Sequence, residues 1–207
     1  MKILIEVGAF DGYDSIKYYN SGYIVHSFEP DKELFSKIKE KTVNLNNYYI
    51  YNKAVHLTDG FANFNIASEN SGANSLLNFR NNEELNKHWM GRTDIYYSGI
   101  SYQVETIRLD TFIEKTNLQT NIIDFIHIDA QGVDLDVLKS LGKYIGNIKE
   151  GVIETVIDLN KSIYSNQTNN ISELKKFLKE NNFSISRIES NDPTNCEYNI
   201  FFKNNLF

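Results

Sequence analysis

An acidic residue stands just before a glycine-containing turn near the start of the chain. Glu6 closes the apolar run 3–7, and the turn that follows has two glycines, Gly8 and Gly12. The dinucleotide fingerprint G-x-G-x-x-G needs a third glycine, which is absent. A carboxylate here disfavours a pyrophosphate and suits a cationic group such as an amine or a sulfonium. The turn therefore predicts a site for a ligand with a positively charged end. The alternative is a tight turn with a surface acid.

A second acid, Glu29, ends the next apolar run, 23 positions after Glu6. In nucleotide-binding α/β sheets an acid at this strand end holds a ribose. A carboxylate accepts two hydrogen bonds, so a vicinal diol is a suitable partner. The alternative is an acid that stabilises the start of the following helix. Together, Glu6 and Glu29 favour a ligand that contains adenosine.

A third group ends the most apolar predicted strand, residues 122–128. His127 and Asp129 are two positions apart and so share one face of the chain. Asp129 is suited to act as a general base or as a ligand for Mg²⁺. His127 either assists Asp129 or is a core histidine. Glu154 ends the next strand and either completes an acidic pocket or is another strand-end acid. In the pocket it would contact the substrate and, if Mg²⁺ is used, bind the metal with Asp129.

Alternating apolar patterns predict the elements that position these residues. The predicted strands cover residues 3–7, 23–28, 48–51 with 53–56, 61–66, 102–109, 122–128, 151–157, 183–188 and 198–202. The predicted helices cover residues 14–20, 32–41, 83–89, 110–115, 133–141 and 171–181. Their predicted caps are Asp14 with Ser15, Asp31 and Asp110. Alternation of strand and helix indicates an α/β domain with a mostly parallel sheet. The short loop between the last two strands requires an antiparallel hairpin.

Residues 67–101 form a polar stretch that we interpret as an insertion, or lid, within a single domain of residues 1–207. Long loops in compact domains are commonly functional. We expect its large side chains to bind the substrate, since aromatic faces with polar tips suit a sugar. These residues are Trp89, Arg92, Tyr96 and Tyr97. The alternative is that they pack the insertion onto the domain.

Composition narrows the classes of partner. The chain has 21 Lys and Arg against 27 Asp and Glu, a net charge of −6. It lacks the basic surface typical of nucleic-acid binding, so no nucleic-acid partner is expected. No apolar stretch reaches the length of a membrane span or a signal peptide, so we expect a cytoplasmic protein. The single cysteine, Cys196, permits no intrachain disulfide. A homodimer is compatible with the sequence.

Eight short motifs occur in an order typical of one enzyme family. They are EVGAFDG at 6–12, FEP at 28–30, NKAV at 52–55, DG at 59–60, NSL at 74–76, TIRLDTFI at 106–113, FIHIDAQGVDLDVLKSL at 125–141 and VIE at 152–154. The chain resembles the FkbM-type family of S-adenosylmethionine-dependent methyltransferases. The resemblance implies a Rossmann-like class I methyltransferase fold with an antiparallel C-terminal hairpin.

The resemblance also implies roles for individual residues. Glu29 with Pro30 would bind the ribose, Asp59 would lie near the adenine, and Ser75 near the cofactor or substrate. Asp129 would lie beside the transferred methyl group. The turn residues would hold the methionine part of the cofactor: Glu6, Gly8, Ala9, Phe10, Asp11 and Gly12.

The chain departs from the family pattern at four positions. The family commonly has Asp at Glu6, Asn at Phe10, Lys at His127 and Glu at Asp134. The change at Glu6 keeps the charge. The change at His127 makes this strand end similar to the H-x-D of metal-dependent macrolide and sugar O-methyltransferases, which favours Mg²⁺.

The predicted activity is therefore O-methylation of a sugar or glycan hydroxyl with S-adenosylmethionine. A protonated hydroxyl is a poor nucleophile, so it needs a base or a metal, and Asp129 is the candidate. One alternative is another small hydroxylated metabolite, such as a polyketide. Others are a non-catalytic module that binds an adenosine ligand, and a nicotinamide-dependent oxidoreductase. The missing third glycine and Glu6 argue against the oxidoreductase.

Overall fold

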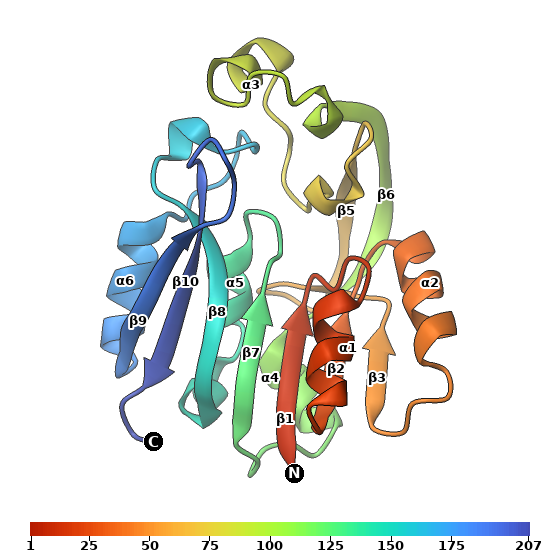
Figure 1. Ribbon diagram of the computed structural model, residues 1–207, viewed down its shortest axis with the longest axis vertical. Coiled ribbons are helices and arrows are strands. Elements are labelled where there is room, and N and C mark those ends of the chain that lie inside the picture. Colours follow the sequence, from red (N-terminus) through yellow and green to blue (C-terminus); the bar gives the residue numbers. More distant parts are fainter.

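The computed structural model describes all residues, 1–207, and is built around one seven-stranded sheet (Figure 1). Its order is β3-β2-β1-β7-β8-β10-β9. The strands are β1 (Lys2–Val7), β2 (Tyr23–Phe28), β3 (Tyr48–Tyr51), β7 (Ile123–Ile128), β8 (Ile148–Val156), β9 (Phe183–Ser190) and β10 (Glu197–Asn204). The pairs from β3 to β8 are parallel, and β10 is antiparallel to both β8 and β9. The predicted α/β class, the mostly parallel sheet and the antiparallel C-terminal hairpin are confirmed.

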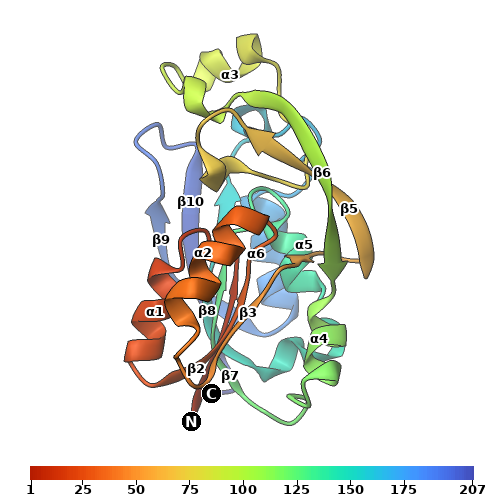
Figure 2. The same cartoon turned by 90° about the vertical axis from the view of Figure 1, so that its right-hand side faces the viewer.

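A second, three-stranded sheet extends beyond the carboxyl ends of the parallel strands (Figure 2). It consists of β4 (Ala54–Val55), β5 (Gly60–Ala67) and β6 (Tyr97–Ile107), in the order β4-β6-β5. The prediction that residues 53–56 continue the third strand of the main sheet is wrong. The chain leaves that sheet at Asn52, because the Asn52 side-chain amide donates to the carbonyl oxygens of Glu29 (2.9 Å) and Pro30 (3.0 Å).

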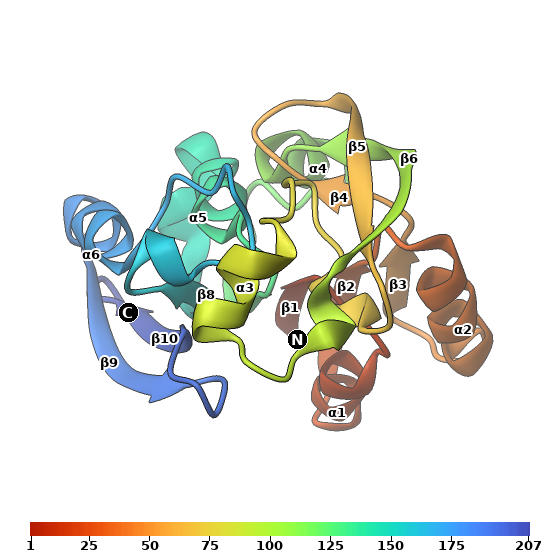
Figure 3. The ribbon, with the colours of Figure 1, turned by 90° about the horizontal axis from the view of Figure 1, so that it is seen from above.

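Helices cover both faces of the main sheet (Figure 3). They are α1 (Tyr13–Asn20), α2 (Lys32–Thr42), α4 (Leu109–Lys115), α5 (Asp134–Lys139) and α6 (Ile171–Glu180), while α3 (Asn82–His88) lies in the insertion. Leu4 of β1 packs in the cluster that contains Ile38 of α2, and the adjacent Ile5 packs in the cluster of α4, α5 and α6. Neighbouring residues of one strand thus face opposite layers, as strand geometry requires.

Two of the predicted helix caps are corrected by the structure. Asp31 caps α2 as predicted, accepting from the main-chain N–H groups of Glu33 and Leu34. The cap of α1 is Gly12, not Asp14 or Ser15, because Gly12 has φ +77°, which favours glycine. The cap of α4 is Arg108. Asp110 lies inside that helix, where its carboxylate pairs with the Arg108 guanidinium.

The insertion arches over the carboxyl edge of the sheet (Figures 1 and 3). Besides α3 it contains short 3₁₀ helices at Ser71–Ala73 and Thr93–Ile95, and β6 begins within it at Tyr97. Its far side is tied to the loop after β8, because the Arg80 guanidinium donates to the carbonyl oxygens of Leu159 (2.7 Å) and Ser162 (3.0 Å). The insertion is therefore held to the rest of the domain on both sides of the carboxyl edge that it covers. None of the helices combines the length and apolar character that crossing a membrane requires.

Candidate active site

The glycine turn after β1 lies against the end of β7. Gly8 has φ +83°, and a Cβ placed on it would lie 1.8 Å from the carbonyl oxygen of Asp129. Main-chain N–H groups of Gly8 and Ala9 both donate to the carbonyl oxygen of Phe28, each at 3.0 Å. Only glycine fits at position 8, and its absent side chain lets the ends of β1, β2 and β7 meet.

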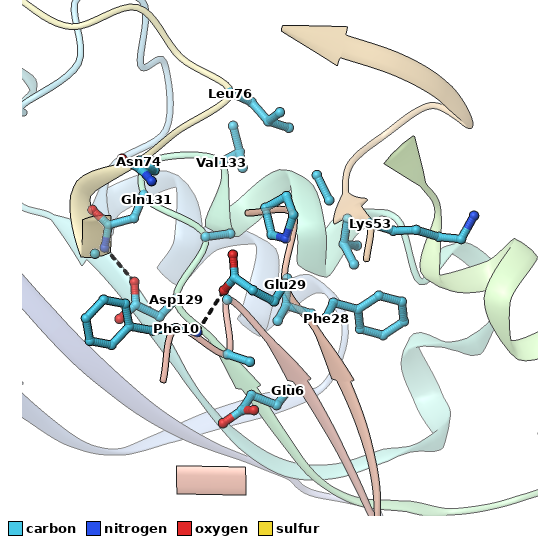
Figure 4. A pocket seen from close by; sticks show the side chains of 18 of the residues that line it. Glu6, Phe10, Phe28, Glu29, Lys53, Asn74, Leu76, Asp129, Gln131 and Val133 are labelled. Carbon is cyan, nitrogen blue, oxygen red and sulfur yellow. Dashed lines mark hydrogen bonds between the residues drawn. The ribbon is translucent and has the colours of Figure 1, made fainter. Parts of the chain in front are cut away.

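A cavity of about 220 Å³ opens where these strand ends meet, below the arch (Figure 4). Most of the site residues predicted near the strand ends line it. They are Glu6, Gly8, Ala9, Phe10, Asp11, Glu29, Pro30, His127 and Asp129. Gly12 does not line the cavity, since it begins α1 behind the turn. The position agrees with the rule that open α/β sheets bind ligands at the carboxyl ends of their strands.

Glu29 projects into the cavity with its carboxylate oriented by backbone. Its Oε2 accepts from the N–H of Phe10 and its Oε1 from the N–H of Asp31, both at 2.8 Å. Burial raises the pKa of Glu29 to about 8, against the opposing effect of these two hydrogen bonds. A carboxyl held in this way has lone pairs left to accept from a diol.

Glu6 and His127 form a buried pair on the side of the sheet covered by α1. The Nδ1 atom of His127 lies 3.7 Å from Oε1 of Glu6, and the Ser27 hydroxyl donates to Oε2 at 2.5 Å. Burial lowers the pKa of His127, but the carboxylates of Glu6, Asp129 and Asp14 together outweigh this effect, so the net shift is upward. In Figure 4 the Glu6 side chain points away from Glu29. The structure thus gives His127 an acidic partner other than Asp129.

Asp129 is held by a residue that the sequence reasoning missed. The side-chain amide of Gln131 donates to Oδ1 of Asp129 at 2.7 Å and to Oε2 of Glu154 at 3.2 Å. Its Oε1 accepts from the Tyr164 hydroxyl at 2.8 Å. Gln131 has φ +51°, an uncommon conformation for a residue other than glycine, yet nothing in the sequence indicated that. Oδ2 of Asp129 accepts no hydrogen bond within the protein.

The predicted acidic pocket exists, and two of its three carboxyls already accept two hydrogen bonds each. One oxygen each of Asp129, Asp134 and Glu154 lie within 4.8 Å of one another. Asp134 accepts from the N–H groups of Ala130 (2.6 Å) and Gly132 (2.9 Å), and burial raises its pKa to about 7. Glu154 accepts from Gln131 and Asn191, and burial raises its pKa well above the ordinary value. Each oxygen of Asp134 and of Glu154 is thus engaged by an N–H donor, so only Asp129 keeps an oxygen free for a cation.

The other end of the cavity is apolar. Its walls are Phe28, Val55, Phe64, Leu76 and Val133, none of which the sequence reasoning had selected. Asp59 and Ser75, which the resemblance places near the adenine and near the cofactor or substrate, do not themselves line the cavity. The carboxylate of Asp59 accepts from the N–H of Arg108 (2.7 Å) and the hydroxyl of Thr111 (2.8 Å). The hydroxyl of Ser75 donates to the carbonyl oxygen of Gln131 at 2.6 Å, so Ser75 supports the wall rather than lining it.

The structure does not bring the four predicted substrate residues of the insertion to the cavity. Trp89 is 2% exposed, and its indole N–H donates to the carbonyl oxygen of Lys161 at 2.7 Å. Arg92 pairs with Asp94 through two hydrogen bonds. Tyr96 donates to the Asn86 side chain at 2.7 Å. Tyr97 stacks on Phe79. These contacts agree with the alternative, in which the four residues pack the insertion onto the domain.

Known structures share this arrangement of strands and helices. The fold is similar to that in a fibrillarin/Nop5p complex, with a TM-score of 0.51 and 16% identity over 98% of this chain and 72% of that chain. An rRNA methylase from Streptococcus thermophilus gives a TM-score of 0.48 and 10% identity over 99% and 87%. The 1,6-didemethyltoxoflavin-N1-methyltransferase of Burkholderia thailandensis gives 0.47 and 10% over 98% and 71%. These likenesses concern the fold alone. The likeness to the fibrillarin/Nop5p complex, together with the order of the seven-stranded sheet, confirms the predicted class I methyltransferase fold.

No curated protein matches the chain significantly. A family model described as the methyltransferase FkbM domain matches residues 6–185. That range includes every residue that lines the cavity. The chain therefore belongs to the FkbM family of methyltransferases, and the predicted methyltransferase activity is confirmed.

Proposed function

We propose that the protein transfers a methyl group from S-adenosylmethionine to a hydroxyl of a sugar or glycan. The observation that carries this proposal is the carboxylate of Asp129. It lines the cavity beside the glycine turn, with Oδ1 held by Gln131 and Oδ2 without a partner in the protein. A partly exposed carboxylate with one unused oxygen is suited to take a proton from an incoming hydroxyl.

The residues that line the cavity suit both the adenosine part and the positively charged part of the cofactor. Glu29 would accept from the ribose hydroxyls, and the apolar walls around Phe28, Val55 and Leu76 suit a purine ring. The carboxylate of Asp14 also lines the cavity, where it would stabilise the positive charge of the cofactor. When bound, S-adenosylmethionine supplies an electrophilic methyl group on a cationic sulfur. The chain's own residues would align the acceptor and remove its proton.

Proton removal matters more for a hydroxyl than for a thiol or an amine, because a neutral hydroxyl is a weak nucleophile. A positioned base contributes a rate factor of roughly 10²–10⁴. Asp129 would accept the hydroxyl proton on Oδ2 while Gln131 holds Oδ1. Because Asp129 alone of the acidic trio keeps a free carboxylate oxygen, no metal is part of this proposal.

The choice of a sugar rests on the family resemblance and on the polar side chains near Asp129. Asp14 and Asn74 line the same cavity and add polar groups that suit a polyhydroxylated ring. The net charge of −6 supports an acceptor other than a nucleic acid. Another hydroxylated metabolite is the competing acceptor, and the assay below separates the two.

The test begins with calorimetric titration of the purified protein with S-adenosylmethionine, S-adenosylhomocysteine and NAD. We expect binding of the first two and none of NAD. Methyl transfer is then measured against methyl pyranosides of hexoses and 6-deoxyhexoses, and against phenolic and polyketide hydroxyls, with Mg²⁺ and with EDTA. Transfer only to the non-sugar hydroxyls would replace the sugar by the competing acceptor. No binding of either methyl-cofactor form would refute the proposal.

The role of Asp129 is tested by Asp129→Asn. We expect turnover to fall by roughly 10²–10⁴ with unchanged affinity for S-adenosylhomocysteine. Asp136→Asn is the matched control, since Asp136 belongs to the same segment but does not line the cavity. Equal losses of turnover and cofactor affinity in Asp129→Asn would assign this residue to cofactor binding instead.

A further inference from the structure

Phe10 has a backbone conformation that an aromatic residue rarely adopts. Its φ is +52°, in the left-handed region, where bulky L residues are strained and Asn is favoured among residues other than glycine. The main chain here has a clear task, because the N–H of Phe10 donates to Oε2 of Glu29 at 2.8 Å. Glycine or asparagine would perform that task with less strain. The benzyl side chain therefore has a separate reason to be there.

Packing does not supply that reason. The side chain of Phe10 is 44% exposed and belongs to none of the buried hydrophobic clusters. No other aromatic ring pairs with it. A strained residue that leaves its apolar ring in solvent contributes little to stability. Such an arrangement at a cavity mouth is typical of a ligand contact.

The ring lies at the end of the cavity where the chemistry is expected. Phe10, Asp129 and Gln131 all line the cavity, and Figure 4 shows these three at one end, with Lys53 at the other. A Cβ placed on Gly72 would lie 3.6 Å from Cε2 of Phe10. The ring edge thus meets the short helix Ser71–Ala73 of the arch.

We propose that the Phe10 ring is the platform on which the acceptor lies, and that the acceptor is a pyranose that presents a C–H face to it. This inference rests on the proposed function and adds the subsite. An aromatic face binds the apolar face of a sugar ring, while polar groups around it bind the hydroxyls. Asp129 provides such a group at the same end of the cavity, so a pyranose on Phe10 would place a ring hydroxyl near Oδ2 of Asp129.

The insertion provides no free aromatic surface for the acceptor, and Phe10 would take that role. Trp89 is buried, and Tyr97 stacks on Phe79, so the aromatic residues of the arch are engaged elsewhere. Phe10 is the aromatic residue that is both exposed and part of the cavity. From this arrangement we infer that the protein recognises the acceptor through the face of its sugar ring and not by closure of a lid.

The test uses Phe10→Asn, because Asn tolerates positive φ and keeps the N–H that donates to Glu29. We expect unchanged affinity for S-adenosylhomocysteine in calorimetry and a melting temperature that stays equal or rises. For the pyranoside that the wild type methylates, we expect KM to rise roughly 2–10-fold, the size of effect that loss of one stacking contact gives. Phe10→Tyr keeps the ring and should restore KM.

The outcomes separate this inference from the proposed function. If the wild type binds S-adenosylhomocysteine but methylates no pyranoside, the proposed sugar chemistry fails. The platform is then tested alone by saturation-transfer NMR of methyl pyranosides on the product-loaded protein, where absence of contact in the wild type would overturn it. An unchanged KM in Phe10→Asn would overturn it too. Loss of S-adenosylhomocysteine affinity in that variant would assign the ring to the cofactor.

Discussion

Gly8 and Asp129 are in backbone contact across two neighbouring strands: a Cβ on Gly8 would lie 1.8 Å from the carbonyl oxygen of Asp129. The main-chain N–H of Asp129 also donates to the carbonyl oxygen of Val7 at 3.0 Å. The spacing between the cofactor turn and the proposed base is therefore set by main-chain atoms, which are the least adaptable part of the site.

Replacing Gly8 by alanine should separate the turn from the end of β7. The positive φ alone costs about 1–2 kcal/mol in a residue with a Cβ, and the clash with Asp129 adds to it. We therefore expect the free energy of unfolding to fall by more than about 1–2 kcal/mol. Binding of S-adenosylhomocysteine should be lost as well. Gly22→Ala is the matched control, because Gly22 has φ +85° and no atom near its missing Cβ. Equal destabilisation of both variants, with normal binding, would contradict the contact.

Glu29 should make the stability of the ligand-free protein depend on pH. Burial raises its pKa to about 8, whereas an unfolded glutamate titrates near ~4.3. Between these values the folded state keeps a proton that the unfolded chain has lost. The stabilisation is complete below ~4.3 and disappears as pH rises towards about 8. Asp134 and Glu197, whose pKa values burial raises to about 7 and about 8, act in the same direction.

Glu29→Gln removes this titration. Denaturant unfolding between pH 5 and 8.5 should therefore show a shallower decline than in the wild type, by up to about one proton. Glu40→Gln, which changes an exposed carboxyl of α2, should leave the wild-type slope unchanged. The amide can accept only through one oxygen, so the S-adenosylhomocysteine affinity of Glu29→Gln should fall by roughly 10–100-fold. An unchanged slope would show that Glu29 is ionised in the folded protein.

The residues at strand ends could be predicted because parallel strands present their carboxyl ends at one edge of the sheet. Glu29 and Asp129 follow apolar runs that are unmistakable as buried strands, and Gly8 marks a turn between strand and helix. Periodicity alone gave these positions, and the family motifs added their roles. Periodicity and motifs both depend on residues that are close together in the sequence. The positions of Glu29, Asp129 and Gly8 depend on the same short-range structure.

The residues of the insertion could not be placed in this way. An aromatic side chain in a polar stretch is equally suited to face a ligand or a neighbouring loop. The deciding contacts of Trp89 and Arg80 are to residues 159–162, far along the chain. The same holds for Gln131, whose role depends on Tyr164 and Glu154. Long-range partners such as these are specified by the fold and leave no pattern in the sequence nearby.

Gln131 should act as a positioning residue for Asp129. Gln131→Leu keeps most of the volume but removes the amide that donates to Oδ1 of Asp129. We expect kcat to fall about tenfold or more with little change in KM for either substrate, because the carboxylate is mis-oriented rather than lost. Gln131→Asn, which keeps the amide on a shorter arm, should recover part of the rate. A fall in melting temperature with normal kcat would limit Gln131 to a structural role.

Trp89 provides the test that distinguishes a packed arch from a substrate-binding lid. Trp89→Phe keeps an aromatic ring but leaves the carbonyl oxygen of Lys161 without its donor, which should lower the free energy of unfolding by about 1–3 kcal/mol. Because the indole lies in the cluster with Leu85 and Tyr164, away from the cavity, KM for the acceptor should be unchanged. A lid that binds the acceptor through Trp89 would give the reverse, a raised KM at wild-type stability. Measuring unfolding and initial rates on the same preparation separates the two, and Phe10→Asn, with the opposite expectation in both measurements, serves as the matched comparison.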